Sequence, residues 1–534
     1  MSLFNQHSYD VESQELENFG KLPQLWHEDD TGNKLSKETH QQQQQSLKAF
    51  HNLDALFLDT SPPFRSYQHQ MQELANIESQ YSELIKPHTN PKTTNTTNQD
   101  VVRHEVNTRK LSTDQVIRLG GEKFIQSCSS SSINSISMPS HPYRSSFLNF
   151  SDQEAKDVEL VQNLLLSAEK VSQKQFERAI KLLNWCDLLS SNSGNPIQRL
   201  VYYFSKALRE KIGNETGRIS IHGPGKRHLD DLEGRLLTFN PTWASVYKKL
   251  PFFQVAQFSG VQALVDAAMG ASKVHVIDLS IKQGVHYTIL MQALVSQPAC
   301  KIHHLKVTVV GTNFKEKINQ TGNWLKSFAE SINLSFSFNV VMVEDMLDFR
   351  KDLLDLDREE SLAVYSSYGL WRMIGKQDRL ESLMKVIRSI SPRVMVVSEA
   401  AVNLNSTKFV NRFVEALFYF GAFFDALEDC MDREDEHRSI TECVYMGNGI
   451  YNNIVATEGL ERAVRNVDVN VWRQFFSRFG MKEIELSMSS LYQANLVAEI
   501  FACGSSCTFE MDGNCMIIGW KGSPIQFLSA WKFS

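Results

Sequence analysis

The sequence predicts an α/β protein in which a polar N-terminal region precedes a helical region and a parallel sheet covered by helices. Residues 1 to about 150 are rich in Gln, Ser, Thr and Asn. From about residue 156, apolar side chains recur every three or four positions, which is the period of a helix. After Pro241, short apolar runs alternate with stretches long enough for crossover helices. Near-continuous apolar strands that alternate with helices are typical of a parallel sheet buried on both faces.

The N-terminal region contains three polar tracts. They are the run Gln41 to Gln45, the stretch from Pro87 to Asp100, and the segment Ser127 to Ser140, which holds eight serines. Such tracts bury too little apolar area to offset chain entropy, so we expect most of residues 1–150 to be disordered. One apolar island, Leu53 to Leu58, interrupts the region.

A second island lies at Leu111 to Leu119. Ser112 or Thr113 would cap a short amphipathic helix that carries Val116, Ile117 and Leu119. We expect this helix to pack on the folded part of the chain. A partner-binding motif is the alternative.

The helical region predicts three helices with one apolar face each. The first two faces are formed by Leu160, Leu164, Ala168 and Val171, and by Ala179, Ile180, Leu183 and Cys186. Asn195 would cap the third helix, with Pro196 at its first position and Ile197, Leu200, Val201, Phe204 and Leu208 on one side. These faces could pack against one another or against a partner protein.

Five apolar runs predict the parallel strands. They lie at residues 274–279, 305–310, 336–343, 362–365 and 394–397. Two further runs, Leu496 to Ala502 and Met516 to Trp520, are expected to close the sheet as an antiparallel hairpin. Phe527, Leu528, Trp531 and Phe533 crowd the C-terminal segment with large apolar groups, so we expect it to belong to the core.

Composition limits the classes of function. The chain has 534 residues, with 55 basic against 61 acidic side chains and a formal net charge of −6. Autonomous nucleic-acid binding needs a basic face, so this balance argues against it. The first thirty residues hold seven carboxylates and no apolar run, and no uncharged apolar stretch approaches the roughly 20 residues of a membrane span. We therefore expect neither a secretory signal nor a membrane segment.

The eight cysteines are scattered along the chain, which favours free thiols in a reducing compartment. Cys503, Cys507 and Cys515 cluster near the C-terminus without a CxxC pair. Buried strand thiols are favoured there over a zinc site.

The loop after the first predicted strand is where an open α/β sheet would bind a ligand. A nucleotide-type site needs small residues there, but Ile281, Lys282 and Gln283 precede the single glycine, Gly284. The second strand should end in an acid that holds a ribose hydroxyl, yet it runs into Gly311-Thr312-Asn313. Both halves of the cofactor signature are missing, so no cofactor is expected.

Three polar residues near this loop are the candidates for a role. Asp278 either caps the following helix or contacts a ligand or partner. His275 alternates with buried strand positions and is expected to be a hydrogen-bonded core histidine, whereas His286, early in a helix, could be exposed. The HExxH, GxSxG and GxxxxGK[ST] signatures are absent from the sequence. The segment His222 to His228 is interpreted as a basic loop, at best a weak nuclear-import patch.

Residues 156 to 534 resemble the plant GRAS family of transcriptional regulators in the order and spacing of five regions. The helices at 160–210 are similar to its first leucine-rich region, and residues 325–374 to its second. The VHIID motif corresponds to Val274, His275, Val276, Ile277 and Asp278, followed by Gln283 and Gly284. The PFYRE region corresponds to Pro392, Phe413 to Phe424 and Ile454 to Arg462, and the SAW motif to Ser529, Ala530 and Trp531.

The sequence departs from the family pattern at two places. Asn448-Gly449 stands where the family usually has an Arg-Glu pair, and Leu279 replaces the usual Phe after the VHIID Asp. These departures bear on the contacts with partners and not on membership of the family. The N-terminal region also lacks the DELLA and TVHYNP-type motifs that gibberellin receptors recognise, so degradation triggered through them is not expected.

The resemblance implies a Rossmann-like core similar to that of methyltransferases that use S-adenosylmethionine, with an α-helical cap. We expect a variable region at 1–150 and a GRAS domain at 151–534, with its cap at about 156–240 and its core at about 241–534. Fold does not settle function.

The function implied by the resemblance is that of a nuclear, non-enzymatic transcriptional co-regulator in developmental, hormone or root-symbiosis signalling. Its expected partners are DNA-binding transcription factors and other GRAS proteins, bound through helical faces and sheet-edge grooves. An active methyltransferase or a small-molecule receptor is the rival interpretation.

Overall fold

The computed structural model describes residues 110–129, 151–217, 241–296, 302–456 and 465–534, and the structural statements below concern these ranges. The polar tracts of the N-terminal region, the island Leu53 to Leu58 and the basic loop at 222–228 lie outside them.

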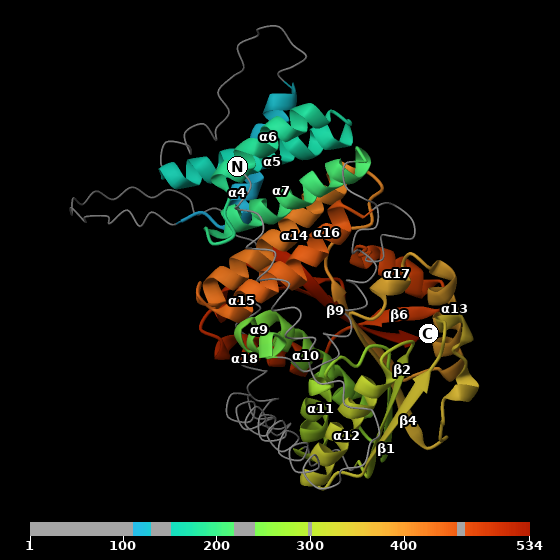
Figure 1. Cartoon of the computed structure of the whole chain (residues 1–534). Helices are drawn as coiled ribbons and strands as arrows, with labels where there is room; N and C mark the ends of the chain where they lie inside the picture. Colours follow the sequence, from blue (N-terminus) through green and yellow to red (C-terminus); the bar gives the residue numbers. More distant parts are fainter. Residues whose placement is uncertain (1–109, 130–150, 218–240, 297–301, 457–464) are drawn as a thin grey trace, which may run out of the picture. The chain divides into compact units, whose positions relative to one another are not determined.

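Five parallel strands form the first part of one sheet (Figure 1). They are β1 (Lys273–Asp278), β2 (His304–Gly311), β3 (Phe336–Met342), β4 (Glu360–Ser367) and β5 (Val394–Ala400), in the spatial order β3-β2-β1-β4-β5. Each coincides with a predicted apolar run. The order reverses at β1, which pairs with β2 on one side and β4 on the other. This is the expected Rossmann-like arrangement, and it puts the switch point at the carboxyl end of β1.

The C-terminal strands continue the sheet in the antiparallel direction. β9 (Ser523–Phe533) pairs with β5 on one side, and with β8 (Cys515–Trp520) and β6 (Met481–Ile484) on the other. β7 (Cys507–Asp512) pairs with β8 at the edge.

The predicted strand at Leu496 to Ala502 is wrong. Most of it lies in helix α18 (Met488–Ile500), and the hairpin is formed by β7 and β8 instead. A short apolar run fits a buried helix as well as a strand, and the N-cap decides here. The Ser487 hydroxyl accepts a hydrogen bond from the Ser490 backbone N–H at 3.1 Å, which starts the helix.

Helices cover both faces of the sheet. One face packs against α10 (Pro251–Ala268), α11 (Val285–Ser296), α12 (Lys315–Ser331) and α18, the other against α13 (Gln377–Ile390) and α17 (Val469–Ser477). Side chains alternate accordingly, so Val274 and Val276 of β1 face the first layer and Ile277 the second.

Strand β9 is buried on both faces. Phe527 and Trp531 join the cluster under α13 and α17, and Leu528 and Ala530 join the cluster under α10. The Trp531 side chain packs on Phe476 with ring centroids 4.8 Å apart, and the residue is only 2% exposed. The assignment of this segment to the core is confirmed.

The helices of the cap form a third apolar cluster. It joins α4 (Thr113–Ser129), α5 (Asp152–Ser172), α6 (Phe176–Leu189) and α7 (Pro196–Glu215) to α14 (Phe409–Cys430) and α16 (Gly447–Ile454). As predicted, Asn195 caps α7: its side chain accepts from the Gln198 backbone N–H, and Gln198 reaches back in a capping box.

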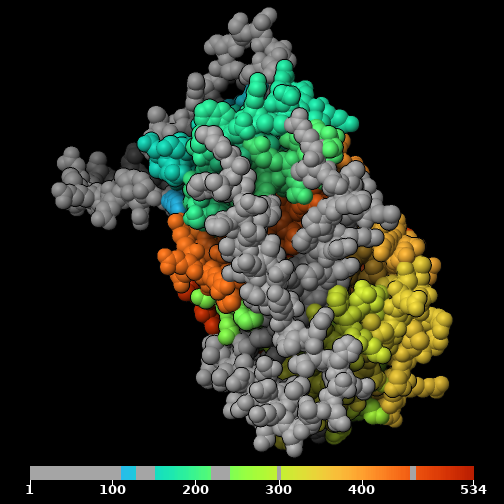
Figure 2. Space-filling view, in the orientation of Figure 1, coloured from blue at the N-terminus to red at the C-terminus, as the bar shows by residue number. Residues whose placement is uncertain are grey.

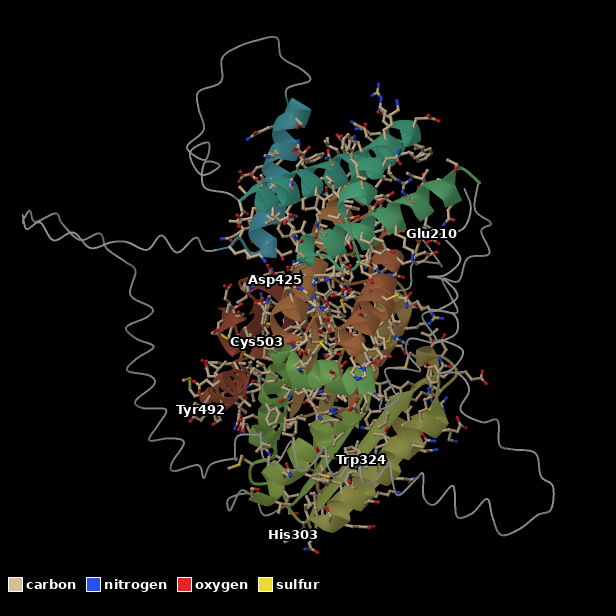
Figure 3. All side chains as sticks on the ribbon, turned by 60° about the vertical axis from the view of Figure 1, so that its left-hand side comes forward. Glu210, His303, Trp324, Asp425, Tyr492 and Cys503 are labelled. Carbon is tan, nitrogen blue, oxygen red and sulfur yellow. A yellow bond between two sulfur atoms is a disulfide. The ribbon has the colours of Figure 1, made fainter. Side chains whose placement is uncertain are left out.

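Helix α4 packs on the folded body, as expected for the island at 111–119. Val116 and Ile117 are buried in the cap cluster. The Thr113 hydroxyl donates to Asp425 of α14 at 2.7 Å, and the same carboxylate accepts from the Trp520 indole of β8 at 3.1 Å. Asp425, labelled in Figure 3, thereby ties α4 and α14 to the C-terminal strands.

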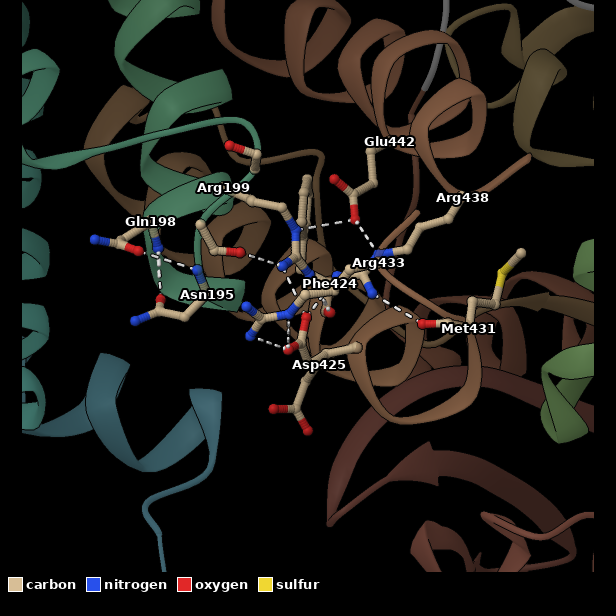
Figure 4. Close-up of polar contacts among 12 residues, drawn as sticks. Asn195, Gln198, Arg199, Phe424, Asp425, Met431, Arg433, Arg438 and Glu442 are labelled. Carbon is tan, nitrogen blue, oxygen red and sulfur yellow. Dashed lines mark hydrogen bonds and ion pairs between the residues drawn. The ribbon is translucent and has the colours of Figure 1, made fainter. Parts of the chain in front are cut away.

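A buried ion network joins the cap to the core (Figure 4). Arg199 of α7 pairs with Glu428 of α14 at 2.8 Å and with Glu442 at 3.0 Å. Glu442 belongs to a π-helical segment, Thr441–Met446, which follows α15 (Glu436–Ile440). Arg438 of α15 bonds the same two carboxylates. Each charge of this network therefore has partners of opposite sign, which offset the cost of removing it from water.

We predict that Trp531→Ala lowers the free energy of unfolding by about 3–5 kcal/mol, because the cavity left between β9 and α17 cannot be refilled. Urea unfolding of the full-length chain, followed by circular dichroism, measures the change. Lys532→Thr, at the exposed next position, should stay within about 0.5 kcal/mol of the unmodified chain. Equal stability of the two variants would contradict the placement of Trp531 in the core.

We also predict an acid-sensitive contribution from Glu428. Burial alone would raise the pKa of its carboxyl, but hydrogen bonds from Arg433, Arg438 and Arg199 lower the pKa to about 2. A carboxyl whose pKa falls on folding stabilises the protein above its unfolded pKa of about 4.5, and this stabilisation is lost as the pH falls toward 2. The loss of stability between pH 5 and pH 3 should therefore be steeper for the unmodified chain than for Glu428→Gln, as urea titrations at each pH would show. Parallel curves would refute the assignment.

Candidate functional site

The carboxyl end of β1 carries Asp278, which is fully buried. Its carboxylate accepts from the Ser280 backbone N–H at 2.6 Å and from the Tyr287 hydroxyl at 2.8 Å, and it lies 3.1 Å from His286 Nε2. These partners belong to the following loop and to the first turn of α11. Asp278 therefore holds side chains of the first turn of α11, but it accepts no hydrogen bond from a backbone N–H of that helix and is not a helix cap in the predicted sense.

His286 is buried, and the expectation that it could be exposed is wrong. It is 3% exposed, and its ring stacks on Tyr365 of β4 with centroids 4.7 Å apart. The reason is that α11 lacks a polar face: nine of its residues, from Val285 to Leu294, are buried. A helix that is apolar all round is buried on all sides.

His275 is the hydrogen-bonded core histidine that the alternation predicted. Its Nδ1 lies 2.9 Å from Glu360 and its Nε2 lies 2.7 Å from the Thr308 hydroxyl. Burial lowers the pKa of the imidazole, against the attraction of Glu360.

The loop after β1 is filled by large side chains. Ile281 and Gln283 are buried, and Gly284 has φ +73° and sits so close to α12 that a Cβ would lie 2.7 Å from Thr321 Cγ2. A Cβ on Gly369, in the loop after β4, would lie 3.0 Å from Ser280 Cβ. The two loops thus pack against each other where a nucleotide would need an open backbone.

The residues present do not fit S-adenosylmethionine. The loop offers no glycine-lined approach, and β2 ends at Gly311 with the exposed Thr312 and Asn313 beyond it, so no carboxylate stands where a ribose would bind.

The remaining motif positions lie apart from this loop. Pro392 is buried in the turn between α13 and β5, directly after Ser391, whose left-handed backbone ends the helix. Ser529, Ala530 and Trp531 lie within β9, where the Trp531 indole donates to the Ser529 hydroxyl at 2.9 Å. These residues organise the turn before β5 and the strand beside it.

The cysteines correct one expectation. Cys430, at the end of α14, and Cys503, after α18, form a disulfide across 73 residues, so they are not free thiols. Sequence spacing could not show that the two ends meet. Cys507 and Cys515 are buried in β7 and β8, as expected, and burial raises the pKa of the Cys507 thiol to about 12. The described residues contain no cluster of His, Cys, Asp or Glu that could hold a metal ion.

A cavity of about 320 Å³, which the sequence did not predict, opens beside the filled loop. Its floor is formed by the loop after β1 and by residues of β4, β5 and β9, and its walls by α9 (Pro241–Lys249), α10, α14, the π-helical segment and α16. Lys282 and Gln283 of the VHIID region line it, as do Asn448 and Gly449, where the sequence departs from the family pattern. In the sequence, only the unusual Asn448-Gly449 pair pointed to this place. The fold is needed to bring that pair next to Lys282 and Gln283.

The π-helical segment connects the cavity to the cap. Thr441, Tyr445 and Met446 line the cavity, whereas Glu442 of the same segment bonds Arg199 of α7. π-Helical turns occur frequently at functional sites.

Comparison with known proteins places the chain in a family. The model of the GRAS domain family matches residues 160–532. DELLA protein 2 of Medicago truncatula is 29% identical over 388 residues, which cover 72% of this chain and 69% of that protein. DELLA protein RGL1 of Arabidopsis thaliana is 29% identical over 385 residues, or 72% of this chain and 71% of that protein.

The fold has a counterpart among solved structures. The crystal structure of SCL7 from Oryza sativa matches with a TM-score of 0.62 and 24% identity, and the match covers 70% of this chain and 99% of that one. The Rossmann-like sheet with a helical cap is therefore shared. With the match at 160–532, these likenesses establish that the chain belongs to the GRAS domain family of plant regulators.

Proposed function

We propose that this GRAS protein is a nuclear transcriptional co-regulator that acts by binding DNA-binding transcription factors and other GRAS proteins, and that it has no enzymatic activity. The observation that carries the proposal is an exposed apolar pair on the outer side of the cap. Trp185 is 60% exposed and Leu188 is 73% exposed, one helical turn apart on α6. Two such side chains next to each other form an apolar patch that a partner can cover, and Trp is enriched in protein interfaces.

The position of α6 supports this role. The helix packs against α5 and α7 through Ala179, Leu183 and Cys186, which leaves the opposite side to solvent. Figure 2 shows the cap helices, in teal and green, at the top of the view, with no other coloured element over their outer side. We call Trp185 and Leu188 the α6 face. Its proposed occupant is the helical cap of another GRAS protein, which would offer a similar leucine-rich surface.

The charge balance supports indirect association with DNA. Residues 150–534 carry 42 Lys and Arg against 44 Asp and Glu, so the folded domain has no net positive field to attract phosphates. None of the described helices is both long and apolar enough to cross a membrane.

The filled loop supports the non-enzymatic part of the proposal. A methyltransferase must bring its cofactor against the backbone after β1, and here Ile281 and Gln283 occupy that position. The rival function, a methyltransferase, lacks a supporting observation among these contacts.

We predict that the double variant Trp185→Ser/Leu188→Ser loses binding to GRAS partners while it keeps its fold. Both side chains are exposed, so the melting temperature should stay within a few degrees. A two-hybrid panel of GRAS proteins that includes this chain itself measures binding.

The matched control is Arg178→Ser/Lys181→Ser, an exposed pair with the same spacing on the same helix. The control should bind as the unmodified chain does. Undiminished binding by the Trp185/Leu188 variant would show that partners use another surface.

We predict that the full-length chain shows no saturable binding of S-adenosylmethionine at submillimolar concentrations, because the loops after β1 and β4 close the space that the adenosine would need. Titration calorimetry, with an active methyltransferase of the same fold as positive control, provides the test. Micromolar binding that Asp278→Asn weakens would instead favour the enzyme.

A further inference from the structure

The disulfide between Cys430 and Cys503 has no part in the function proposed above. Cys430 is the last residue of α14, and Cys503, labelled in Figure 3, lies in the turn after α18. Their Cα atoms are 6.1 Å apart across a sequence separation of 73 residues. The bond therefore connects the end of a helix that supports the cap to the segment that leads into the C-terminal strands.

Solvent can reach both bonded residues. Cys430 and Cys503 are half-buried, whereas three cysteines outside the disulfide, Cys186, Cys507 and Cys515, are buried. Burial raises the pKa of the Cys186 and Cys507 thiols to about 12, which keeps them protonated. Thiol–disulfide exchange needs a thiolate that can reach the sulfur it attacks. The half-buried disulfide is accessible to such a thiolate from solvent.

The end of α14 also carries the joint between cap and core. Glu428, two residues before Cys430, bonds Arg199 of the cap at 2.8 Å. The carbonyl oxygen of Met431, one residue after Cys430, accepts a hydrogen bond from Arg438 at 2.9 Å. A covalent bond at Cys430 therefore restrains the last turn of α14, and with it the position of Glu428 in the ion network.

The other sulfur lies beside α9. Cys503 Sγ is 3.8 Å from the carbonyl oxygen of Lys249, the last residue of that helix. A disulfide sulfur has no proton to donate, whereas a thiol at this position can donate a weak hydrogen bond. Reduction would thus remove the bond to α14 and provide a donor for the end of α9, whose residues Trp243 and Tyr247 line the cavity.

A separate set of contacts holds the two cysteines near each other without the disulfide. The Lys521 ammonium pairs with Asp425 at 2.8 Å and with Asp429 at 2.7 Å, both on α14. The Lys521 backbone N–H donates to the carbonyl oxygen of Ser506 at 2.7 Å, in the turn that follows Cys503. The two thiols would therefore stay close after reduction, and the bond could form again without refolding.

A permanent disulfide is not expected where this chain is proposed to act. In the nucleus, glutathione and thioredoxin-type dithiols keep thiols reduced, and disulfides that do form are usually transient and redox-sensing. This expectation rests on the nuclear location proposed above. Opening and closing of the bond in the isolated chain involves no partner, so a failure of the inference would leave the co-regulator proposal unchanged.

We infer that Cys430 and Cys503 form a reversible switch that couples the redox state of the surrounding thiols to the joint between cap and core. A thiolate of a dithiol reductant attacks one sulfur and breaks the S–S bond, and the second thiol of the reductant then closes it into a disulfide. Two electrons and two protons pass to the protein, which ends with two thiols. The oxidised form restrains the end of α14, and the reduced form releases it.

The state of the bond is measured on the folded, full-length chain at varied ratios of reduced to oxidised dithiothreitol. Iodoacetamide labels free thiols, and peptide mass spectrometry identifies the labelled residues. We expect Cys430 and Cys503 to gain the label together as the ratio rises and to lose it together as the ratio falls. Labelling of both at every ratio, of only one, or of neither in excess reductant would overturn the inference.

The effect on the joint is measured by hydrogen–deuterium exchange of the fully oxidised and the fully reduced chain. Amides at the end of α14 and in the turn at residues 501–506 should exchange about threefold faster or more after reduction, because a covalent restraint is lost. Helix α12, elsewhere on the sheet, serves as the internal reference. Equal exchange of the α14 amides in both states would show that the bond does not act on the joint, and would refute the switch.

The variant Cys503→Ser cannot form the bond and keeps a side chain of similar size. Its exchange should match that of the reduced chain under both conditions. The matched control, Cys443→Ser, removes another half-buried thiol and should keep the full difference between oxidised and reduced chain. A difference that survives in Cys503→Ser would assign the effect to other cysteines and contradict the inference. The labelling experiment uses the unmodified chain, so it decides the matter even if a variant does not fold.

Discussion

The position of strand β9 inside the sheet is the constraint on which the rest of the structure depends. β9 pairs with β5 on one side and with β8 and β6 on the other, so among the described strands it alone joins the parallel and antiparallel halves of the sheet. Its side chains enter the cores of both faces. Its residue Gln526 also accepts a hydrogen bond from the Tyr368 hydroxyl at 2.8 Å, so the same strand fixes the floor of the cavity. The SAW motif, Ser529 to Trp531, is therefore part of the strand that joins the two halves of the sheet.

The joint between cap and core depends on electrostatics rather than on apolar contact alone. Arg199 and Arg438 share Glu428 and Glu442, and each of the two arginine side chains is only 3% exposed. Charges removed from water in this way stabilise the fold only in one geometry, because the loss of a partner leaves an unpaired ion behind. The network therefore specifies how α7 sits on α14 and α15. It also holds the π-helical segment, which keeps Tyr445 in the cavity wall.

The sequence predicts those parts of the fold that local patterns determine. Periodic apolar faces and the Asn195 cap locate the cap helices, and five apolar runs locate the parallel strands, because burial imposes a period on each. The sequence predictions are wrong where contacts between distant parts of the chain decide the local structure. The run at Leu496 fits a helix or a strand, His286 is polar in a helix that is buried all round, and Cys430 meets Cys503 only after folding. The cavity is invisible to the sequence for the same reason, since its walls come from segments between Trp243 and Gln526. The sequence locates Asp278 at the end of a strand, but it does not show which residues bond the carboxylate.

The cap cluster is built from two stretches that are distant along the chain. α4 to α7 supply one half, and α14 and α16 supply the other, so that Phe204 meets Phe413 with ring centroids 5.2 Å apart. The cap helices α4 to α7 therefore do not form an independent unit, because their core includes residues of α14 and α16. An exchange of residues 113–217 alone would set new cap helices against an unchanged α14 and its Glu428, which pairs with Arg199 of α7. We therefore expect substitutions in the cap helices to require compensating substitutions in α14.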